Sequence, residues 1–389
     1  MIDFWQEARL LRPILTHIRR ELHQYPELGW REIRATQLIE EQLHRLGAQI
    51  VPWGSMTGAV GLLQGARPGR TVALRADIDA LPLEEHNVAP YRSQRKGIMH
   101  ACGHDGHVAC ALGAAMLLAE HARLWRGTVK LIFQPAEETG GGAELLIGRD
   151  VLHNPEVSAI FALHCQPELP TGYIGLREGA LMAANDFIDI TITGKSGHGA
   201  LPHRARDPIA ASAAILQALA NLHFRGIDPL QAAVISFGKI NGGTARNIIP
   251  NAVEMEGTIR TLEPALRTAL LPQVADLIGQ VAAAYGTEAT ASFPRHFPAV
   301  INPAGLAGFC RRSLAGTEAK LAASEPVMLT EDFALFQQKI PGVLLWLGVG
   351  NREKGLTHPL HSDRFDLDED ALAFGTAALA KLAFDYLDD

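Results

Sequence analysis

Hydrophobic and polar residues follow two different periods along the first part of the chain. Residues 6–24 and 33–46 place apolar side chains three and four positions apart, which predicts two amphipathic helices. A further segment at residues 108–121 has the length of a helix. Between the helices lie short apolar runs with the length of buried strands, at residues 58–63, 71–74, 129–133 and 159–163. This alternation predicts an α/β fold with a helix-covered mixed sheet.

The middle of the chain carries a second, smaller pattern. Its predicted elements are a strand at 187–192, a helix at 208–222, strands at 233–237 and 253–260, a helix at 263–285 and a strand at 288–293. The order β-α-β-β-α-β is that of a ferredoxin-like domain, which we expect as an insertion at residues 185–296. A buried strand at 342–348 and a helix at 369–387 then indicate that the first domain resumes, so residues 1–184 and 297–389 form one discontinuous domain.

Composition and charge narrow the class of partner. The 389 residues have a formal net charge of -7 and contain no dense lysine and arginine block, so we expect neither nucleic acid nor a membrane surface as partner. The N-terminus lacks the pattern of a signal peptide, and the apolar stretches are too short to span a bilayer. We therefore expect a cytoplasmic protein that acts on a small molecule.

Polar clusters follow the predicted strands of the first domain. Asp77 and Asp79 follow the strand at 71–74, Glu137 and Glu138 follow the strand at 129–133, and His164 ends the strand at 159–163. Because open α/β sheets bind ligands at the carboxyl ends of their strands, these side chains are expected to converge on one crevice.

Two further segments are rich in metal-binding side chains. Residues 99–107, with the sequence MHACGHDGH, offer a thiol, imidazoles and a carboxylate, and the glycines let the backbone bring them together. Packing alone does not explain that density, whereas Cys110, Cys165 and Cys310 are interpreted as core residues. The loop at 357–365 adds His358 and His361, and their spacing does not decide which of them is a ligand.

The adjacent carboxylates of Glu137 and Glu138 have two interpretations. Neighbouring side chains in a turn diverge, so one carboxylate can bind a metal while the other acts as general base. The alternative is a solvated acidic turn that opens a helix. The other clusters nearby favour the catalytic interpretation.

The chain resembles the M20 metallopeptidase clan, specifically its amidohydrolase branch of hippurate hydrolases, N-acyl amino acid deacetylases and plant auxin-conjugate hydrolases. The resemblance covers nearly the whole chain. The motifs that carry it are ELHQYPEL at 21–28, LRADIDALP at 74–82, HACGHDGH at 100–107, QPAEE at 134–138, GGTARNIIP at 242–250, GTIRT at 257–261, TEDF at 330–333 and His361-Ser362.

The resemblance implies a centre of two divalent metal ions, zinc or manganese, with cobalt or nickel as alternatives. Cys102 would bridge the ions, Glu137 would be the general base, and Asp79 would orient the ligands. Asp77 stands where peptidases of the clan have a metal-binding histidine, which favours the amidohydrolase branch. The implied metal ligands are Cys102, His104, Glu138, His164 and His361.

In the smaller domain, residues 194–203 resemble the lid motif of the family. The resemblance implies that His198 stabilises the oxyanion, and that Asn247 and Arg260 bind the substrate. Alanine is usual in the family where Gly199 stands here, which we expect to loosen the backbone beside His198. The resemblance also implies a homodimer that forms through this lid domain, and it leaves open whether His198 serves its own subunit or the neighbour.

These observations predict an enzyme that hydrolyses the amide bond of N-acyl amino acids, either hippurate-like or N-acetyl substrates, by a metal-activated water with Glu137 as base. One alternative within the fold is a dipeptidase or carboxypeptidase. A binding protein without turnover and a structural zinc protein are the alternatives from other classes. The acyl group, the amino acid and the metal are not determined by the sequence.

Overall fold

The computed structural model describes residues 2–52, 54 and 56–388; residues 1 and 389, the ends of the predicted catalytic domain, lie outside the described residues. The chain divides into two compact units, which we call unit 1 and unit 2. Unit 1 comprises residues 1–179, 301–325 and 335–389. Unit 2 comprises residues 180–300 and 326–334.

Unit 1 contains a mixed sheet, which in the described part of the chain has eight strands in the order β1-β2-β4-β3-β5-β17-β6-β16. Its centre is parallel, because β3 pairs in parallel with both β4 and β5, and β5 with β17. β2 and β6 run antiparallel to their inner neighbours. The strands are β1 (Gln49–Val51), β2 (Ala59–Gln64), β3 (Thr71–Asp77), β4 (Thr128–Gln134), β5 (Val157–Pro170), β6 (Tyr173–Leu176), β16 (Lys320–Ala323) and β17 (Gly342–Gly350).

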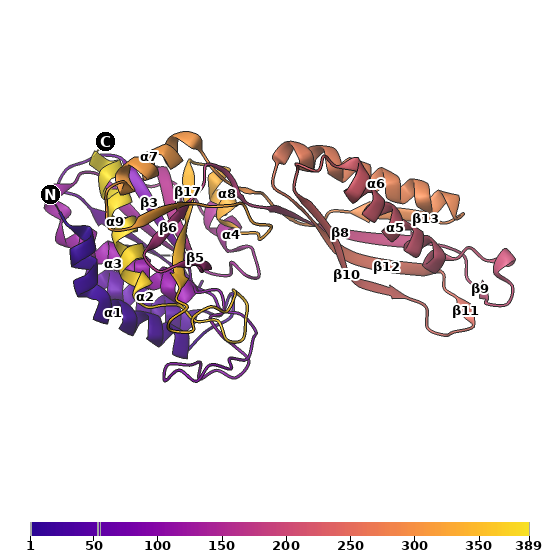
Figure 1. Ribbon diagram of the computed structural model, residues 1–389, viewed down its shortest axis with the longest axis horizontal. Helices are drawn as coiled ribbons and strands as arrows, with labels where there is room; N and C mark the ends of the chain where they lie inside the picture. The colour runs from indigo at the N-terminus through magenta and orange to yellow at the C-terminus, as the bar shows by residue number, and fades with distance from the viewer. Residues whose placement is uncertain (1, 53, 55, 389) are drawn as a thin grey trace. The chain divides into compact units, whose positions relative to one another are not determined.

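Helices cover this sheet, and the core of unit 1 lies between them and the strands (Figure 1). α3 is almost entirely buried, since it packs against α1, α9 and strand β3. Its alanine and glycine residues allow this close packing on several sides. The helices of unit 1 are α1 (Phe4–Gln24), α2 (Ile33–Arg45), α3 (His104–Glu120), α4 (Gly142–Gly148), α7 (Ala304–Leu314) and α9 (Ala371–Asp388), with the 3-10 turn η1 (Ala122–Leu124).

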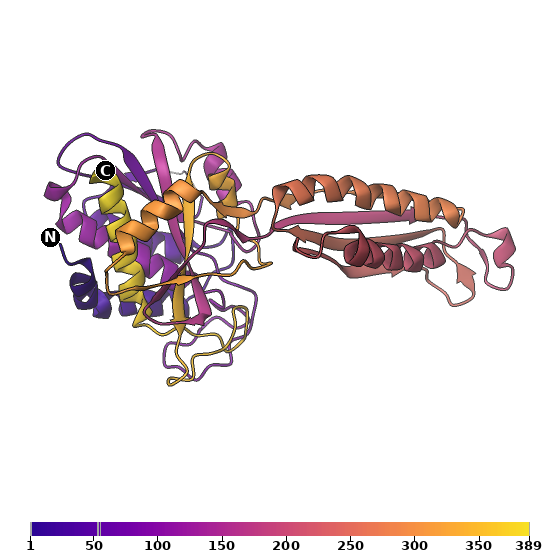
Figure 2. The same ribbon diagram turned by 45° about the horizontal axis from the view of Figure 1, so that its top comes forward.

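Unit 2 has its own sheet, ordered β10-β12-β8-β13, and its own core (Figure 2). Residues 188, 190 and 192 of β8 face α5 and α6, while the residues between them face away from the helices. α5 begins where Asp207 accepts hydrogen bonds from two amides of the first turn. The elements are β8 (Ala184–Thr193), β9 (Gly197–His198), η2 (Pro202–Arg204), α5 (Pro208–Gly226), β10 (Ala233–Gly242), β11 (Ile248–Ile249), β12 (Ala252–Thr261), α6 (Pro264–Ala284), β13 (Glu288–Ser292) and β14 (His296–Phe297).

Three short elements lie where the chain passes from one unit to the other, namely β7 (Gly179–Met182), β15 (Val300–Asn302) and α8 (Phe333–Gln337). Among the described residues, no helix has the length and apolar character needed to cross a membrane.

One predicted element differs from the structure. The sequence predicts that the strand at 159–163 ends at His164, but β5 continues to Pro170. Its neighbour β17 pairs with it over this whole length, through a register irregularity between Gly348 and Gly350. A side chain on Gly348 would lie 2.1 Å from the carbonyl oxygen of Pro170, so the glycine permits this pairing. His164 therefore lies within a strand rather than at its end.

Candidate metal centre

The parallel strands β4, β3 and β5 bring the predicted polar clusters of unit 1 to one edge of the sheet. β3 ends at Asp77 and β4 at Gln134, and the two glutamates follow β4 in a turn. The last register pair between β3 and β5 joins Arg75 to Ala162, so Asp77 is level with His164 two residues further on. The sheet topology thus positions residues that are far apart in the sequence.

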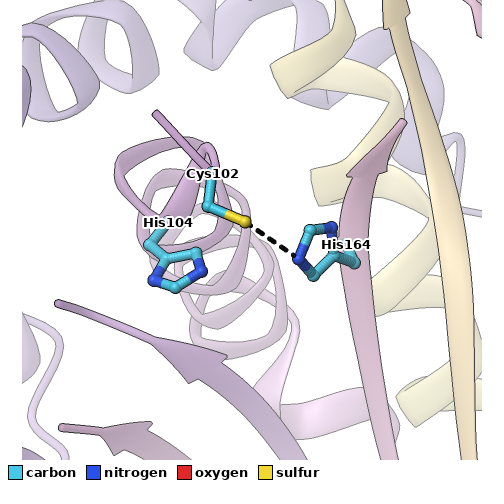
Figure 3. Close-up of side chains that lie close together, drawn as sticks. All are labelled: Cys102, His104 and His164. Carbon is cyan, nitrogen blue, oxygen red and sulfur yellow. Dashed lines mark hydrogen bonds between the residues drawn. The ribbon is translucent and has the colours of Figure 1, made fainter. Parts of the chain in front are cut away.

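Cys102, His104 and His164 form the most buried part of the cluster (Figure 3). Their ligand atoms all lie within 4.8 Å of one another, and Cys102 Sγ is 3.5 Å from His164 Nε2. Gly103 separates the first two and has φ +86°, which a residue with a side chain rarely adopts. A Cβ at this position would also lie 2.8 Å from the sulfur of Cys165. Glycine therefore allows the thiol and the imidazole to face the same point.

Backbone carbonyls fix the tautomers of both histidines. His104 Nδ1 lies 2.8 Å from the carbonyl oxygen of Asp79, and His164 Nδ1 lies 2.9 Å from that of Cys165. Because a carbonyl only accepts, each Nδ1 carries the hydrogen and each neutral ring has its lone pair on Nε2. Among the described residues, the buried Nε2 of His104 has no hydrogen-bond partner. Both lone pairs are therefore available to a metal.

Glu138 and His361 lie beside Cys102 on the other side of the cluster. The ligand atoms of these three residues are within 4.8 Å of one another, and His361 Nε2 is 3.2 Å from Glu138 Oε1. The amide of His361 donates to the carbonyl oxygen of Ala101, which holds this loop against the cysteine loop. His358 belongs to none of the metal-ligand groups found in the described residues. The geometry thus selects His361 from the two histidines of this loop.

Two aspartates and a histidine surround these side chains. Asp79 Oδ2 accepts a hydrogen bond from the amide of Glu138 at 3.0 Å, and its Oδ1 is 3.3 Å from His104 Nδ1. His107 has both ring nitrogens engaged by the protein: Nδ1 is 2.5 Å from Asp77, and Nε2 accepts from the amide of Cys165 at 2.8 Å. His107 therefore has no lone pair left for a metal.

The electrostatics of the cluster suit a divalent cation. Burial raises the pKa of the Cys102 thiol well above its usual value, and Glu138 and Glu137 raise it further. Burial alone would lower the pKa of His104, but Asp77 and the other carboxylates outweigh it and raise the pKa to about 10. Burial lowers the pKa of His164 to about 3, so this ring is neutral. The excess of buried acidic groups favours positive charge beside His104 Nε2, which either a proton on that nitrogen or a divalent cation in its place supplies.

His198 and Asn247 are neighbours in unit 2. His198 lies in β9, where it pairs with Ile248 of β11, and the amide of Gly199 donates to the carbonyl oxygen of Asn247 at 2.8 Å. A Cβ at Gly199 would lie 3.1 Å from that oxygen, so the glycine allows the two strands to approach closely. His198 Nδ1 accepts a hydrogen bond from the amide of Ala200 at 3.0 Å. The neutral ring therefore carries its hydrogen on Nε2 and can donate it.

The structure does not bring Arg260 together with His198. Arg260 is opposite Asn185 at one end of β8, whereas β9 follows the other end of β8 after Thr193. At about 3.3 Å per residue, the eight steps between these positions span roughly 26 Å. Arg260 instead donates to the carbonyl oxygen of Met328 at 3.0 Å and to the hydroxyl of Thr330 at 2.8 Å.

The sequence patterns did not predict a role for two sets of buried, charged side chains in unit 1. Glu32 is fully buried beside the turn that carries Glu137 and Glu138. Arg19 and His23 of α1 contact Asp105, the residue after His104. His23 lies in a motif of the family, but no local pattern distinguishes either group from surface residues of a helix.

The thiol, imidazoles and carboxylates gathered at one edge of the sheet in unit 1 form a candidate site for divalent metal ions. A family model, Peptidase family M20/M25/M40, matches residues 73–385. The chain belongs to this family, as the motifs of the sequence indicate. It is a metal-dependent hydrolase that acts on amide bonds.

Three similar proteins illustrate the range of the family. Thermostable carboxypeptidase 1 of Saccharolobus solfataricus is 39% identical over 381 residues, which cover 97% of this chain and 96% of that protein. The N-acetylcysteine deacetylase of Bacillus subtilis is 39% identical over 370 residues, which cover 95% and 96%. The crystal structure of the Bacillus subtilis YXEP protein, a dinuclear metal binding peptidase from the M20 family, is 36% identical and superposes with a TM-score of 0.87. That match covers 98% of this chain and 99% of the YXEP chain.

Proposed function

We propose that this protein removes the acyl group from N-acyl amino acids by hydrolysis of their amide bond, with Glu137 as general base. The observation that carries this proposal is the buried cluster of unit 1, in which two histidine lone pairs, a thiol and carboxylates face one point. A deacetylase with 39% identity supports the substrate class. Asp77, which stands where peptidases of the clan have a metal-binding histidine, also favours this branch of the family.

Each residue of the cluster has a distinct role in this reaction. Cys102, His104 and His164 would hold one divalent cation, and Cys102, Glu138 and His361 a second. Bound cations supply Lewis-acid polarisation and a lower pKa for water. Glu137 accepts a proton from the water that attacks the amide carbon and returns it to the leaving amine. The products are a carboxylic acid and a free amino acid.

A carboxypeptidase is the second candidate, because a relative of that name is also 39% identical. Both reactions cleave an amide bond beside a free carboxylate, so the metal centre does not distinguish them. The distinguishing measurement is the ratio of kcat/KM for N-acetyl and N-benzoyl amino acids to that for dipeptides. We expect the N-acyl compounds to be hydrolysed faster.

We further propose that unit 2 is a ferredoxin-like lid domain, and that His198 serves the active site of a second copy of the chain. A small substrate cannot touch both His198 and Arg260 of one unit 2, since they are separated by roughly 26 Å of sheet. If both contact the same substrate, they come from different subunits. His198 Nε2 would then donate to the oxyanion, and the guanidinium of Arg260 would bind the substrate carboxylate.

The surface of unit 2 that suits this contact is formed by α5 and the edge strand β10. It has a hollow of about 490 Å³ lined by residues of both elements. Phe224 and Ile240 beside it are 77% and 53% exposed, although both are apolar. An apolar sheet edge of this kind is suited to pairing with the same edge of a second copy.

The test combines metal analysis with two variants. Glu137→Gln should retain its metal and lose activity by a factor of about 100 to 10,000, because only the proton acceptor is removed. His198→Ala should also be nearly inactive. When the two variants are mixed, dimers that contain one chain of each should regain activity, since one site then has both an intact Glu137 and an intact His198.

The outcomes separate the claims. Near-normal turnover by the Glu137→Gln variant would exclude Glu137 as the base. Inactive mixtures, measured after subunit exchange has been verified by mass, would exclude the contribution of His198 to the second subunit. A higher kcat/KM for dipeptides than for N-acyl amino acids would be compatible with the proposed metal centre but would identify the enzyme as a carboxypeptidase.

A further inference from the structure

The turn that carries the two glutamates contains one residue in an unusual backbone conformation. Ala136, directly before Glu137, has φ +53° and is fully buried. The left-handed region is unfavourable for an L-residue with a side chain, and such residues persist only where their surroundings hold them. The direction of the Glu137 side chain depends on this conformation, because it is set by the preceding backbone.

The carboxylate of Glu32 holds Ala136 in place. Glu32 Oε1 accepts a hydrogen bond from the amide of Ala136 at 2.8 Å, and both residues are fully buried. An amide in the interior needs an acceptor, since an unpaired one is costly. Glu32 is distant in the sequence, so this bond ties the turn to the start of α2.

Glu32 is itself fixed by a short network. Its Oε2 accepts from the hydroxyl of Thr57 at 2.6 Å, and its carbonyl oxygen accepts from the hydroxyl of Thr36, also at 2.6 Å. The oxygen of Thr36 in turn accepts from the amide of Gly58 at 2.8 Å. The carboxylate therefore has one orientation, with each oxygen engaged by a different donor.

The segment before Glu32 also packs closely against the turn that carries Glu137 and Glu138. A Cβ at Gly29 would lie 2.7 Å from Thr139 Oγ1 and 3.1 Å from the Cα of Ala136. Two residues before Gly29, the carbonyl oxygen of Glu27 accepts a hydrogen bond from the amide of Ala80, the residue after Asp79. The segment 27–32 thus links the end of β3 to the turn after β4.

From these contacts we propose that Glu32 is a positioning residue for the reaction: it holds Ala136 in the left-handed conformation that directs Glu137 towards the metal centre. The inference rests on the proposed role of Glu137 as the base. Glu32 acts through hydrogen-bond geometry rather than through charge, since its contacts are an amide and a hydroxyl. Glutamine can make the same two contacts, with its oxygen accepting from Ala136 and its nitrogen donating to Thr57.

The test compares Glu32→Ala with Glu32→Gln. In the alanine variant we expect kcat to fall by about 100-fold, the loss typical of a misplacement of about 1 Å at a catalytic group. KM should change by less than about threefold, and the protein should still bind its metals, because the ligands do not contact Glu32. The glutamine variant should keep kcat within about fivefold of the original protein.

Two further variants serve as control and rescue. Asp3→Ala removes a similar bond at the start of another helix, where the amide of Gln6 donates to Asp3 Oδ1 at 3.0 Å, and should leave kcat unchanged. Ala136→Gly provides a residue that adopts positive φ without strain. The double variant Glu32→Ala, Ala136→Gly should therefore have a kcat at least tenfold higher than that of Glu32→Ala. If Glu32→Ala alone fails to fold, the double variant is compared with the original protein instead.

Three results would overturn the inference. These are an alanine variant with kcat within threefold of the original, a glutamine variant as impaired as the alanine variant, or loss of bound metal together with activity. Glu137→Gln is measured in the same series. If that variant stays active, the role of Glu137 itself fails, whereas an inactive Glu137→Gln beside an active Glu32→Ala refutes only the role of Glu32.

Discussion

Replacing His23 with glutamine should remove a large part of the pH dependence of the stability of unit 1. His23 is fully buried, with Nδ1 2.7 Å from Asp105 Oδ2 and Nε2 3.3 Å from Glu85 Oε1. Burial and the neighbouring Arg19 lower its pKa, but Asp105 and Glu85 outweigh them and raise it to about 9. With a carboxylate on each side, the ring is held as an imidazolium.

The sign and the size of the effect follow from this pKa. The folded protein binds the proton up to about pH 9, whereas the unfolded chain releases it near the ordinary value of 6.5. The stabilisation is therefore complete below pH 6.5 and is lost as the pH rises through about 9. At about 1.4 kcal/mol per pH unit, the loss amounts to roughly 3 kcal/mol. Above that range two buried carboxylates lose one of their cationic partners.

Tryptophan fluorescence gives a suitable assay, because the tryptophans among the described residues lie in unit 1. They are at positions 5, 30, 125 and 346. Denaturant unfolding of the metal-free protein, followed by this fluorescence at pH 6 and pH 10, reports the free energy of unfolding of the unit that contains His23. Use of a chelator removes the separate pH dependence of metal binding.

The comparison with two variants isolates the contribution of His23. Between pH 6 and pH 10 the original protein should lose about 3 kcal/mol more than the His23→Gln variant does. His17→Gln is the matched control, since His17 is exposed on the same helix, and it should behave like the original protein. Parallel stability curves for the original protein and His23→Gln would show that the ring is not charged in the folded state.

Two predictions concern other buried positions. Lys130→Met should lower the free energy of unfolding by about 1 to 3 kcal/mol, measured by the same fluorescence, because the buried carbonyl oxygen of Val151 and two partly buried carbonyl oxygens lose their donor. Lys130 Nζ donates to these oxygens, which belong to Val151, His153 and Pro155, at 2.8, 2.8 and 2.9 Å. Gly142→Ala should lower kcat at least tenfold, since its Cβ would lie 1.7 Å from the carbonyl oxygen of Pro135 in the catalytic turn. Gly148→Ala in the same helix meets no atom within 4 Å and is the control; equal activity of the two variants would refute the reasoning.

Hydrophobic patterns predicted the long elements because each is buried along its length, on one face for a helix and on both faces for a central strand. The helix at 6–24 is α1, and the strand at 71–74 is the first part of β3, all of whose residues are buried. The end of β5 was predicted wrongly, because the apolar run on which the prediction rested stops at Leu163. Pairing with β17 extends the strand past Pro167, as far as Pro170. Such pairing depends on residues nearly two hundred positions away, which no local pattern contains.

The candidate site shows the same limit. Residue types and motifs identified Cys102 and His104, because a thiol and several imidazoles within a few residues are typical of a metal site. Spacing did not decide between His358 and His361, and only the resemblance to the family implied His361; the structure adds a backbone bond from His361 to Ala101 and its approach to Glu138. No sequence pattern pointed to Glu32, because its proposed role depends on contacts with a turn about a hundred residues away in the chain.

The histidines show most clearly why chemistry cannot be deduced from residue type alone. A carbonyl oxygen beside Nδ1 leaves Nε2 of His104 and His164 with a lone pair, as a metal ligand requires. An amide hydrogen beside Nδ1 of His198 has the opposite effect, so that Nε2 carries a hydrogen, as an oxyanion donor requires. The main chain thus favours opposite tautomers of the same side chain, each suited to the role proposed for it. A substitution that exchanged the backbone partner at either place would abolish the function of the ring without changing the ring itself.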